Sequence, residues 1–230
     1  MDSGVLIAVF VLVAAVAIGI GYLGYLAAKR RREGMAAVAQ ARGWTYAERD
    51  DRWQTHFDGS PFGLGHDRRC SNVLRGTHDG REFVAFDFVY HTTQTQTTGK
   101  TTTTREVAHP FGIVAVDMVA SFPPLEVTPE GFIGRFIGRL TDRDIELESE
   151  DFNRAFTVTC PDRKFASDVL HPRMMELLLQ HPDSAFRFDR SWVLDVESGT
   201  VPLEGIEPRL RRVDAVVDQI PEFVWKEVRG

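Results

Sequence analysis

Cysteine is scarce in this sequence of 230 residues, which has only Cys70 and Cys160. The two are far apart and stand in no metal-ligand spacing, so they are expected to be reduced, packing thiols of a protein in a reducing compartment. The sequence also lacks the H-E-x-x-H and G-x-S-x-G motifs, the signatures of common zinc proteases and of serine hydrolases with a nucleophile elbow. No catalytic residue, cofactor or metal is predicted.

Charge is nearly absent from the first 28 residues, where Asp2 carries the single formal charge. As a helix, the uncharged run 4–28 would be roughly 37 Å long, enough to cross a bilayer core of about 30 Å. A cleaved signal peptide is the alternative, because Ala15-Val16-Ala17 fits a cleavage site. However, no basic segment precedes the run, and apolar sequence continues well beyond that site. We predict an uncleaved transmembrane anchor.

Four consecutive cations follow the apolar run: Lys29, Arg30, Arg31 and Arg32. Cations beside a span are retained on the cytoplasmic side. This predicts a single-pass protein of the cell membrane with its N-terminus outside and its C-terminal domain in the cytoplasm. The same side chains are expected to contact anionic lipid headgroups, each contributing about 1 kcal/mol. The lipid bilayer is therefore the first predicted partner.

The apolar run contains a G-x-G-x-x-G match at residues 19–24, which in a strand–turn–helix unit would indicate a dinucleotide site. No strand precedes it, so that interpretation fails. Small residues instead recur at helical spacing and form one face, composed of Ala17, Gly21, Gly24 and Ala28. Such a face lets another helix approach closely, which predicts a homodimer through the transmembrane helix or a membrane partner.

Beyond the anchor the chain is acidic, because residues 35–230 hold 23 of the 27 cations and 31 of the 33 anions, a net charge of −8. Such a domain is a poor binder of nucleic acid, so a protein of the membrane or the cytoplasm is the more natural partner. The one further basic cluster, Arg209, Arg211 and Arg212, has helical spacing and is predicted to lie on a solvated face.

Turn and periodicity signals predict an α+β fold, in which an N-terminal transmembrane helix precedes a globular domain of mixed antiparallel sheet and helices. We divide the chain into an anchor with its basic flank (1–34), a β-rich half (35–126) and an α+β half (127–230). A short helix, 35–42, is expected to continue the anchor. Asp79-Gly80 predicts a hairpin between strands 68–77 and 81–91, the second buried mainly through its even-numbered aromatics.

Further elements are predicted along the tail. Residues 111–118 read as a core strand, with the β unit ending at 122–124, and Thr128-Pro129 predicts the start of a helix that runs to about residue 140. A strand pair at 143–149 and 156–160, a helix at 172–180, strands at 185–188 and 192–196, and an amphipathic helix at 208–219 complete the prediction.

Two polar segments stand out. Residues 92–104 contain nine threonines and predict a long polar hairpin tip or a mobile loop, serving either recognition or a solvated connection; Gly99-Lys100-Thr101 only imitates a Walker A motif. Carboxylates then occupy every second position at Asp142, Asp144, Glu146, Glu148 and Glu150. A charged, solvent-facing edge strand explains them, and a cation-binding or partner-binding surface is the alternative.

Parts of the tail carry a family resemblance, which is strongest at 144–149 (DIELES), 151–156 (DFNRAF), 162–166 (DRKFA) and 171–175 (HPRMM). On these residues, and more weakly over 43–229, the chain resembles an uncharacterised family of single-span, membrane-anchored bacterial proteins. The resemblance implies an architecture, an N-terminal anchor joined to one cytoplasmic globular unit. It implies no activity, cofactor or catalytic residue.

Two functions are carried forward. The first is a non-enzymatic, membrane-tethered adaptor or interaction module. The second is an enzyme of hydrolase type, or a small-molecule-binding regulator, whose site is built from dispersed residues. That alternative would be favoured by a pocket in which two or more of the following converge: His66, Asp87, His109, Arg154 and Asp162.

Overall fold

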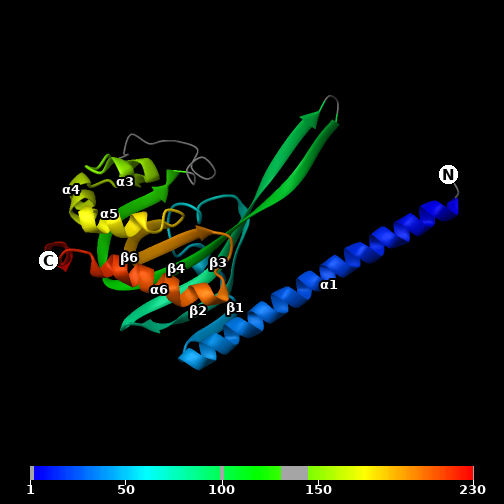
Figure 1. Cartoon of the computed structure of the whole chain (residues 1–230), viewed down its shortest axis with the longest axis horizontal. Coiled ribbons are helices and arrows are strands. Elements are labelled where there is room, and N and C mark those ends of the chain that lie inside the picture. The colour runs from blue at the N-terminus through cyan, green and yellow to red at the C-terminus, as the bar shows by residue number, and fades with distance from the viewer. Residues whose placement is uncertain (1–2, 99–100, 131–144, 230) are drawn as a thin grey trace.

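The computed structural model describes residues 3–98, 101–130 and 145–229 (Figure 1). It contains an antiparallel six-stranded sheet with a long N-terminal helix, α1 (Ser3–Arg42). The strands are β1 (Thr45–Arg49), β2 (His66–His78), β3 (Arg81–Thr98), β4 (Thr101–Pro129), β5 (Phe156–Thr159) and β6 (Ala185–Ser198). Together with the helices these strands confirm the predicted α+β fold, including the continuation of the anchor helix through residues 35–42.

The sheet is organised around β4. Strands β1, β2, β3, β4 and β5 follow one another in sequence order, and β6 also pairs with β4. Residues 101–116 of β4 pair with β3, residues 111–127 pair with β6, and residues 126–129 pair with β5. The expected end of the β unit at 122–124 is therefore wrong, because β6 and β5 supply ladder partners that carry β4 on to Pro129.

Helices cover one face of this sheet. They are α3 (Glu150–Ala155), α4 (Arg163–Val169), α5 (Pro172–Leu179), α6 (Ile206–Asp218) and α7 (Glu222–Arg229), with the 3-10 turn η2 (Leu203–Gly205). A second 3-10 turn, η1 (Asp51–Gln54), packs on the other face through Trp53. Local capping explains three of the starts, since Ser149, Asp162 and His171 each accept a backbone N–H of the first turn of α3, α4 and α5. The C-terminal helix α7 was not among the predicted elements.

Each face of the sheet has its own apolar cluster. The cluster under the helices joins sheet residues such as Val114 and Val116 to Leu210 and Val213 of α6. On the other face, Phe86 and Phe88 pack under the segment between β1 and β2, which contributes Trp53, Phe57 and Phe62. The even-numbered aromatics of β3 are buried as predicted, but Phe83 and Ala85 on the opposite face are equally buried. The central strands are therefore covered on both sides.

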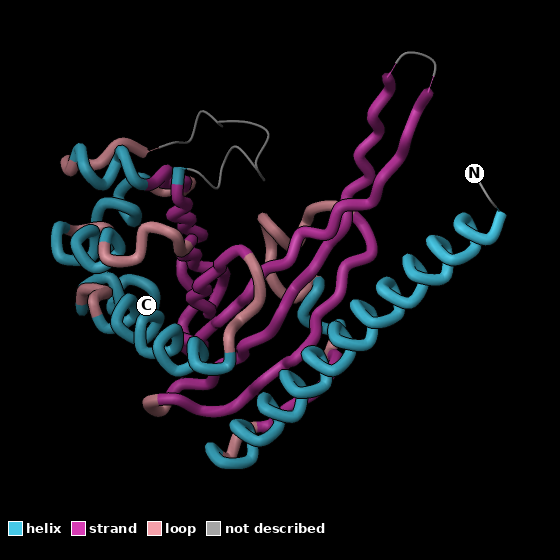
Figure 2. The backbone as a smooth tube through the Cα atoms, turned by 45° about the vertical axis from the view of Figure 1, so that its right-hand side comes forward, coloured by secondary structure: helices cyan, strands magenta, loops and turns pink. Residues whose placement is uncertain are grey.

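The two predicted hairpins are present. Asp79 and Gly80 both have positive φ values, 48° and 77°, as a two-residue turn of type I′ requires. The threonine-rich segment forms a regular ribbon in which β3 and β4 stay paired up to Thr98 and Thr101. In Figures 1 and 2 this ribbon leaves the domain on the same side as the N-terminal part of α1.

Two predictions between residues 128 and 149 need correction. Thr128 is a buried strand residue opposite Thr157 rather than a helix cap, and the rest of the helix expected there lies outside the described residues. Residues 145–149 form an irregular segment instead of an edge strand. The reason is local, because the side-chain amide of Asn153 bonds both the N–H and the C=O of Leu147 and replaces a strand partner.

Strand β6 is one element where two strands were expected. Arg190 has a φ of 56° at the centre of β6, and Val119 has a φ of 59° in β4. Between these points the β4–β6 ladder changes register, at residues 117–122 and again at 122–125. Both strands therefore bend without ending. The division of the tail between residues 126 and 127 stays a prediction.

Candidate functional site

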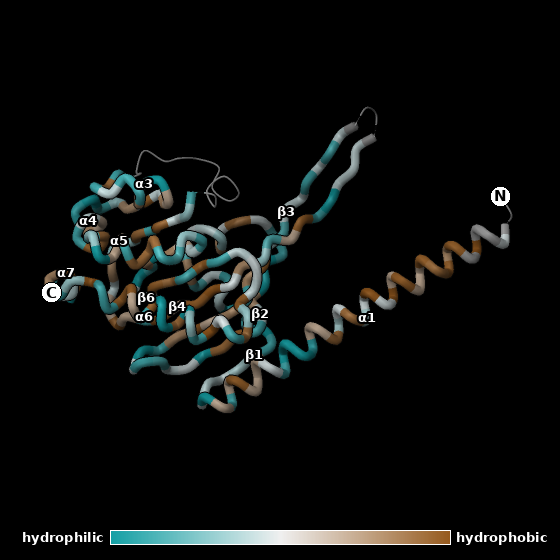
Figure 3. Tube along the Cα trace, in the orientation of Figure 1, coloured by the Kyte–Doolittle hydropathy of each residue, from teal (hydrophilic) through white to brown (hydrophobic). Residues whose placement is uncertain are grey.

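The N-terminal part of α1 is an apolar surface without protein cover. Large side chains there are strongly exposed, for example Phe10 at 75% and Ile18 at 73%. Within the described residues, one helix is long and apolar enough to cross a membrane, over Val9–Arg42, and it contains an 18-residue stretch with a mean hydropathy of 2.3. Figure 3 shows the brown apolar stretch of α1 standing clear of the domain. Exposure on this scale in a monomer marks a surface that something else covers.

The other end of α1 belongs to the domain core. Met35 and Ala39 are 1% and 2% exposed and join the cluster beneath the helices. An added Cβ at Gly34 would lie 3.1 Å from a methyl carbon of Leu203, so the helix backbone packs closely against η2 here. The chain turns directly into β1, with the Trp44 N–H bonded to the Ala39 carbonyl at 2.8 Å. Anchor and domain are therefore joined without a flexible linker.

A buried carboxylate locks this junction. Asp87 on β3 is 6% exposed and accepts hydrogen bonds from both terminal nitrogens of Arg31 on α1. It also accepts the Asn72 side-chain amide at 2.8 Å and the Val201 backbone N–H at 2.9 Å. Arg31 in turn donates to the Val201 carbonyl at 2.6 Å. One carboxylate thus connects α1, β2, β3 and the segment after β6, and every bond is charge-assisted.

The four consecutive cations of residues 29–32 are placed differently from one another. Arg31 faces the domain, whereas Lys29 lies 3.8 Å from Glu33 on the same helix and Arg32 lies 3.7 Å from Glu48 of β1. Arg30 is exposed. Contact between these residues and lipid headgroups stays a prediction, to which Lys29 and Arg30 are the most available contributors.

The small-residue face of the anchor is open. Its members Ala17, Gly21, Gly24 and Ala28 are all exposed, and an added Cβ at Gly21 or Gly24 meets no atom within 4 Å. The helix can therefore be approached closely here, and dimerisation through this face stays a prediction.

The carboxylate series is described only in part. Glu146, Glu148 and Glu150 are exposed, while the intervening Ile145 is buried, so the predicted alternation exists without the strand. Asp142 and Asp144 lie outside the described residues. A cation-binding or partner-binding role for this series stays a prediction.

The five residues proposed for a dispersed catalytic site do not converge. Asp87 is enclosed in the junction, and His109 stacks on Tyr90, on the opposite face of the sheet, with ring centroids 4.8 Å apart. His66 is half exposed beside Glu106. The last two have local partners: Arg154 pairs with Asp151 on the surface of α3, and Asp162 caps α4.

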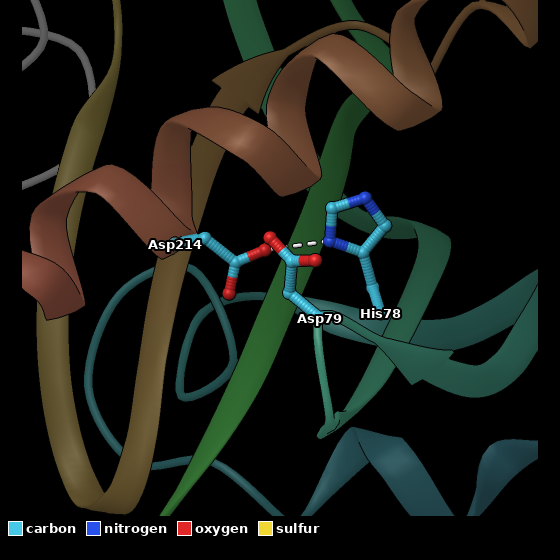
Figure 4. A group of neighbouring side chains, drawn as sticks. All are labelled: His78, Asp79 and Asp214. Atoms are coloured by element: carbon cyan, nitrogen blue, oxygen red, sulfur yellow. Dashed lines mark hydrogen bonds and ion pairs between the residues drawn. The ribbon is translucent and has the colours of Figure 1, made fainter.

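His78, Asp79 and Asp214 form a group with metal-ligand chemistry, since a ligand atom of each lies within 4.8 Å of the others (Figure 4). Asp214 is 4% exposed, and both of its carboxylate oxygens already have partners. It accepts from Arg81 at 3.0 Å, and one of its oxygens lies 2.6 Å from the His78 Nδ1. Because the Arg81 guanidinium already pairs with Asp214, a metal ion bound here would be repelled by a neighbouring positive charge. We interpret the group as an ion-pair cluster that ties the β2–β3 hairpin to α6.

The basic cluster on α6 was predicted to be solvated, and for two of its three arginines this is wrong. Arg209 is 4% exposed and donates to the fully buried Asp195 at 3.0 Å and to the carbonyls of Gly112 and Asp195. Arg212 donates to Asp195 at 2.9 Å and to Glu197 at 2.5 Å. One feature of the sequence did indicate this cluster. Acidic residues 195 and 197 lie on one face of an otherwise apolar strand, and buried carboxylates require cationic partners.

Burial and neighbouring charge act against each other at Glu197. Burial alone would raise its pKa, but Arg209, the Ser184 hydroxyl and Arg212 together hold the pKa below its usual value. The carboxylate is therefore kept ionised, as a closed cluster of two cations and two anions requires.

With this geometry in place, the chain can be compared with known proteins. No protein-family model and no curated protein matches it. Among solved structures, the crystal structure of the mycobacterial trehalose monomycolate transport factor A, TtfA, superposes with a TM-score of 0.55 at 13% sequence identity. The match covers 84% of this chain and 91% of that chain. The two proteins share a fold, and the bacterial source of the neighbour agrees with the family resemblance, whose membership stays a prediction.

Proposed function

We propose that the protein is a single-pass protein of the cell membrane that acts as a non-enzymatic adaptor, with its N-terminus outside and its folded domain in the cytoplasm. The supporting observation is that α1 is one continuous helix, bare and apolar at one end and built into the domain core at the other. Such a helix can hold the domain close to the bilayer in one orientation. The positive-inside rule, applied to residues 29–32, supports the cytoplasmic side.

The structural neighbour supports the adaptor role by analogy. The name of TtfA describes a transport factor for trehalose monomycolate, and we extend only the idea of a transport-associated factor to this chain. The β3–β4 ribbon supports a partner at the membrane, because it projects on the same side as the anchor and its edges at residues 92–98 and 101–107 have no further strand partner among the described residues (Figure 2). Unpaired strand edges are ready sites for pairing with another chain.

The topology can be tested with introduced cysteines, because Cys70 and Cys160 are buried and burial raises the pKa of each thiol, to about 12 for Cys70. A membrane-impermeant maleimide should label a Ser3→Cys variant in intact cells and a Lys226→Cys variant only after lysis. The protein should also stay in the membrane pellet at alkaline pH. Labelling of Lys226→Cys in intact cells would overturn the proposed orientation.

The adaptor role can be tested with a photo-crosslinking residue at Thr95 on the ribbon, compared with one at Arg154 on the exposed surface of α3. The Thr95 probe should link the protein to one defined integral membrane protein in living cells, and the Arg154 probe should not. If both probes give the same diffuse products, the ribbon has no specific partner and the adaptor proposal fails.

A further inference from the structure

A cavity of about 430 Å³ lies where β4 and β6 change register. Both strands bend nearby, at Val119 and Arg190, and the cavity is lined by residues 122 and 124–126 of β4 and residues 187–190 of β6. The loop at Asp58 and Gly59 and the end of β5 complete its wall. Its volume lies in the range of roughly 300–1,000 Å³ that is typical of small-molecule sites, and none of the residues in its wall is used in the adaptor proposal.

Arg187 of β6 lines this cavity and is an unusual arginine. Its side chain is 8% exposed, and its Nη1 donates to the Ser60 carbonyl at 2.6 Å. Its Nε and Nη2 are buried and have no hydrogen-bond acceptor. The nearest carboxylate oxygen, on Glu126, is 3.8 Å from Nη1, beyond hydrogen-bond distance. Burial lowers the pKa of the Arg187 guanidinium, because a desolvated cation without a bonded anion is costly.

The other charged groups of the wall do not supply that anion. Asp189 accepts the Asp58 backbone N–H at 2.7 Å and the Arg190 Nε at 3.1 Å, so its carboxylate is already neutralised. The Asp58 side chain is 89% exposed and is therefore well hydrated. A second void of about 10 Å³ adjoins Arg187, which is room for one water at most. A water can accept a hydrogen bond but brings no negative charge.

The remaining wall is apolar. Phe122, Pro124, Leu125, Pro161 and Phe188 line the same cavity. Phe122 and Phe188 are held in place by an edge-to-face contact with centroids 6.1 Å apart, and Trp225 packs edge-on against Phe122 at 4.9 Å. The wall therefore offers a rigid aromatic and aliphatic surface beside one buried cation. Its other charged groups, Arg190 and the carboxylates of Asp58, Glu126 and Asp189, are paired or exposed. This arrangement suits a ligand with an apolar body and an anionic head.

We propose that this cavity binds an amphipathic organic anion, with a carboxylate or phosphate head against Arg187 and a short apolar chain against Phe122, Leu125 and Phe188. The head supplies a hydrogen-bonded counter-charge, which Glu126 at 3.8 Å does not, and accepts hydrogen bonds from the guanidinium. The chain replaces water along the apolar wall. This is a binding function separate from the adaptor role, and either can fail without the other.

The test uses the full-length protein in nanodiscs of zwitterionic lipid, with empty nanodiscs as the blank, and measures binding by titration calorimetry. The probes are octanoate and octyl phosphate, which distinguish the two head groups. Octanol lacks the charge, and acetate and inorganic phosphate lack the chain. At least one of the two amphipathic anions should bind saturably, and the three truncated probes should bind about tenfold or more weakly.

Three variants separate the contributions. Arg187→Met should weaken binding of the anion about tenfold or more. Pro124→Trp, at the exposed rim of the cavity, should weaken it by steric block while Arg187 remains in place. Arg190→Gln is the matched control, because it removes a cation of the same wall that already has partners, and it should change affinity less than threefold or so. The melting temperature of each variant checks its folding.

The proposal is overturned if neither amphipathic anion binds saturably. It is equally overturned if Arg187→Met folds and binds as tightly as the parent protein, or if octanol binds as well as octanoate. If neither anion binds, Arg187 is a structural residue whose free N–H groups are hydrogen-bonded to water. None of these outcomes changes the membrane topology or the ribbon crosslinks, so failure here is distinguishable from failure of the adaptor proposal.

Discussion

Two buried arginines near opposite ends of the β4–β6 ladder face opposite situations. Arg209 bonds Asp195 and two carbonyls through Nε and Nη2, and only its Nη1, which lies 3.6 Å from Glu197, has no hydrogen-bond acceptor. Arg187 bonds one carbonyl through Nη1 and leaves Nε and Nη2 without an acceptor. The Arg209 guanidinium is hydrogen-bonded to a buried carboxylate of the fold. The Arg187 guanidinium has its nearest carboxylate, Glu126, at 3.8 Å and has two donors without an acceptor, which marks a place for an anion from outside the fold. The predictions below are arranged around this contrast.

The largest effect is expected at Asp195. Asp195→Asn removes the charge that faces two buried cations, and breaking a buried pair from one side typically costs about 3–5 kcal/mol. Urea denaturation of the full-length protein in detergent should show this loss. Asp218→Asn is the matched control, since Asp218 pairs with Arg81 at an exposed position and should cost less than about 1 kcal/mol. Equal losses for the two variants would contradict the buried-cluster interpretation.

A smaller loss is expected at the anchor junction. Arg31→Gln removes two charge-assisted bonds to Asp87, each contributing about 1.5–3 kcal/mol when buried, and the partial exposure of Arg31 reduces the total to about 2 kcal/mol. Arg32→Gln, which removes a pair with the exposed Glu48, should have no measurable effect. Limited proteolysis between residues 28 and 45 should accelerate only in Arg31→Gln. An unchanged cleavage rate would show that the junction is held by apolar packing alone.

A still smaller change is expected for Arg187→Met. The variant loses the bond to the Ser60 carbonyl but also loses a desolvated charge, so the free energy of unfolding should change by less than about 1 kcal/mol. The same denaturation experiment measures it, side by side with Asp195→Asn. A loss as large as that of Asp195→Asn would mean that Arg187 is a structural residue.

The smallest effect is a pH dependence near these two regions. Burial lowers the pKa of His181 and of His56, reinforced by Arg212 and by Arg190 respectively. Because the folded state favours the neutral imidazole, the stability from each histidine is complete above a pH of about 6.5 and is lost as the pH falls through the lowered value. Denaturation at pH 7.5 and pH 5.5 should show a decrease that is reduced in His181→Asn. A stability that rises on acidification would contradict the direction of both shifts.

Local sequence signals predicted many of the helices and strands correctly, but they predicted few of the ion pairs between residues that are distant in the sequence. Asp79-Gly80 predicted its hairpin because the turn conformation is encoded in two adjacent residues, and the apolar period predicted α6 to within two residues at each end. The solvated interpretation of Arg209 failed because the partner Asp195 lies on another element. Asp87 was noticed as a titratable group, but its partner Arg31 is 56 positions away, a distance over which periodicity carries no information.

The cavity could not be predicted for a related reason. It depends on register shifts between β4 and β6, which occur near Val119 and Arg190. Valine and arginine rarely adopt a positive φ, so the sequence gives no indication of a bend at these positions. A buried strand that contains Arg187 was the available sign, because an arginine at an inward-facing position needs an explanation. The sequence could have raised that question, but the geometry was needed to answer it.

The absence of a joint between α1 and the core has a mechanical consequence. Helices that cross a bilayer tilt when the hydrocarbon thickness changes. In a protein whose anchor is packed and ion-paired into its domain, such a tilt would swing the whole domain through the same angle, and the ribbon would trace the widest arc. If α1 spans the membrane as proposed, the lipid composition determines the angle between the domain and the membrane, and so the orientation in which the domain meets its partners.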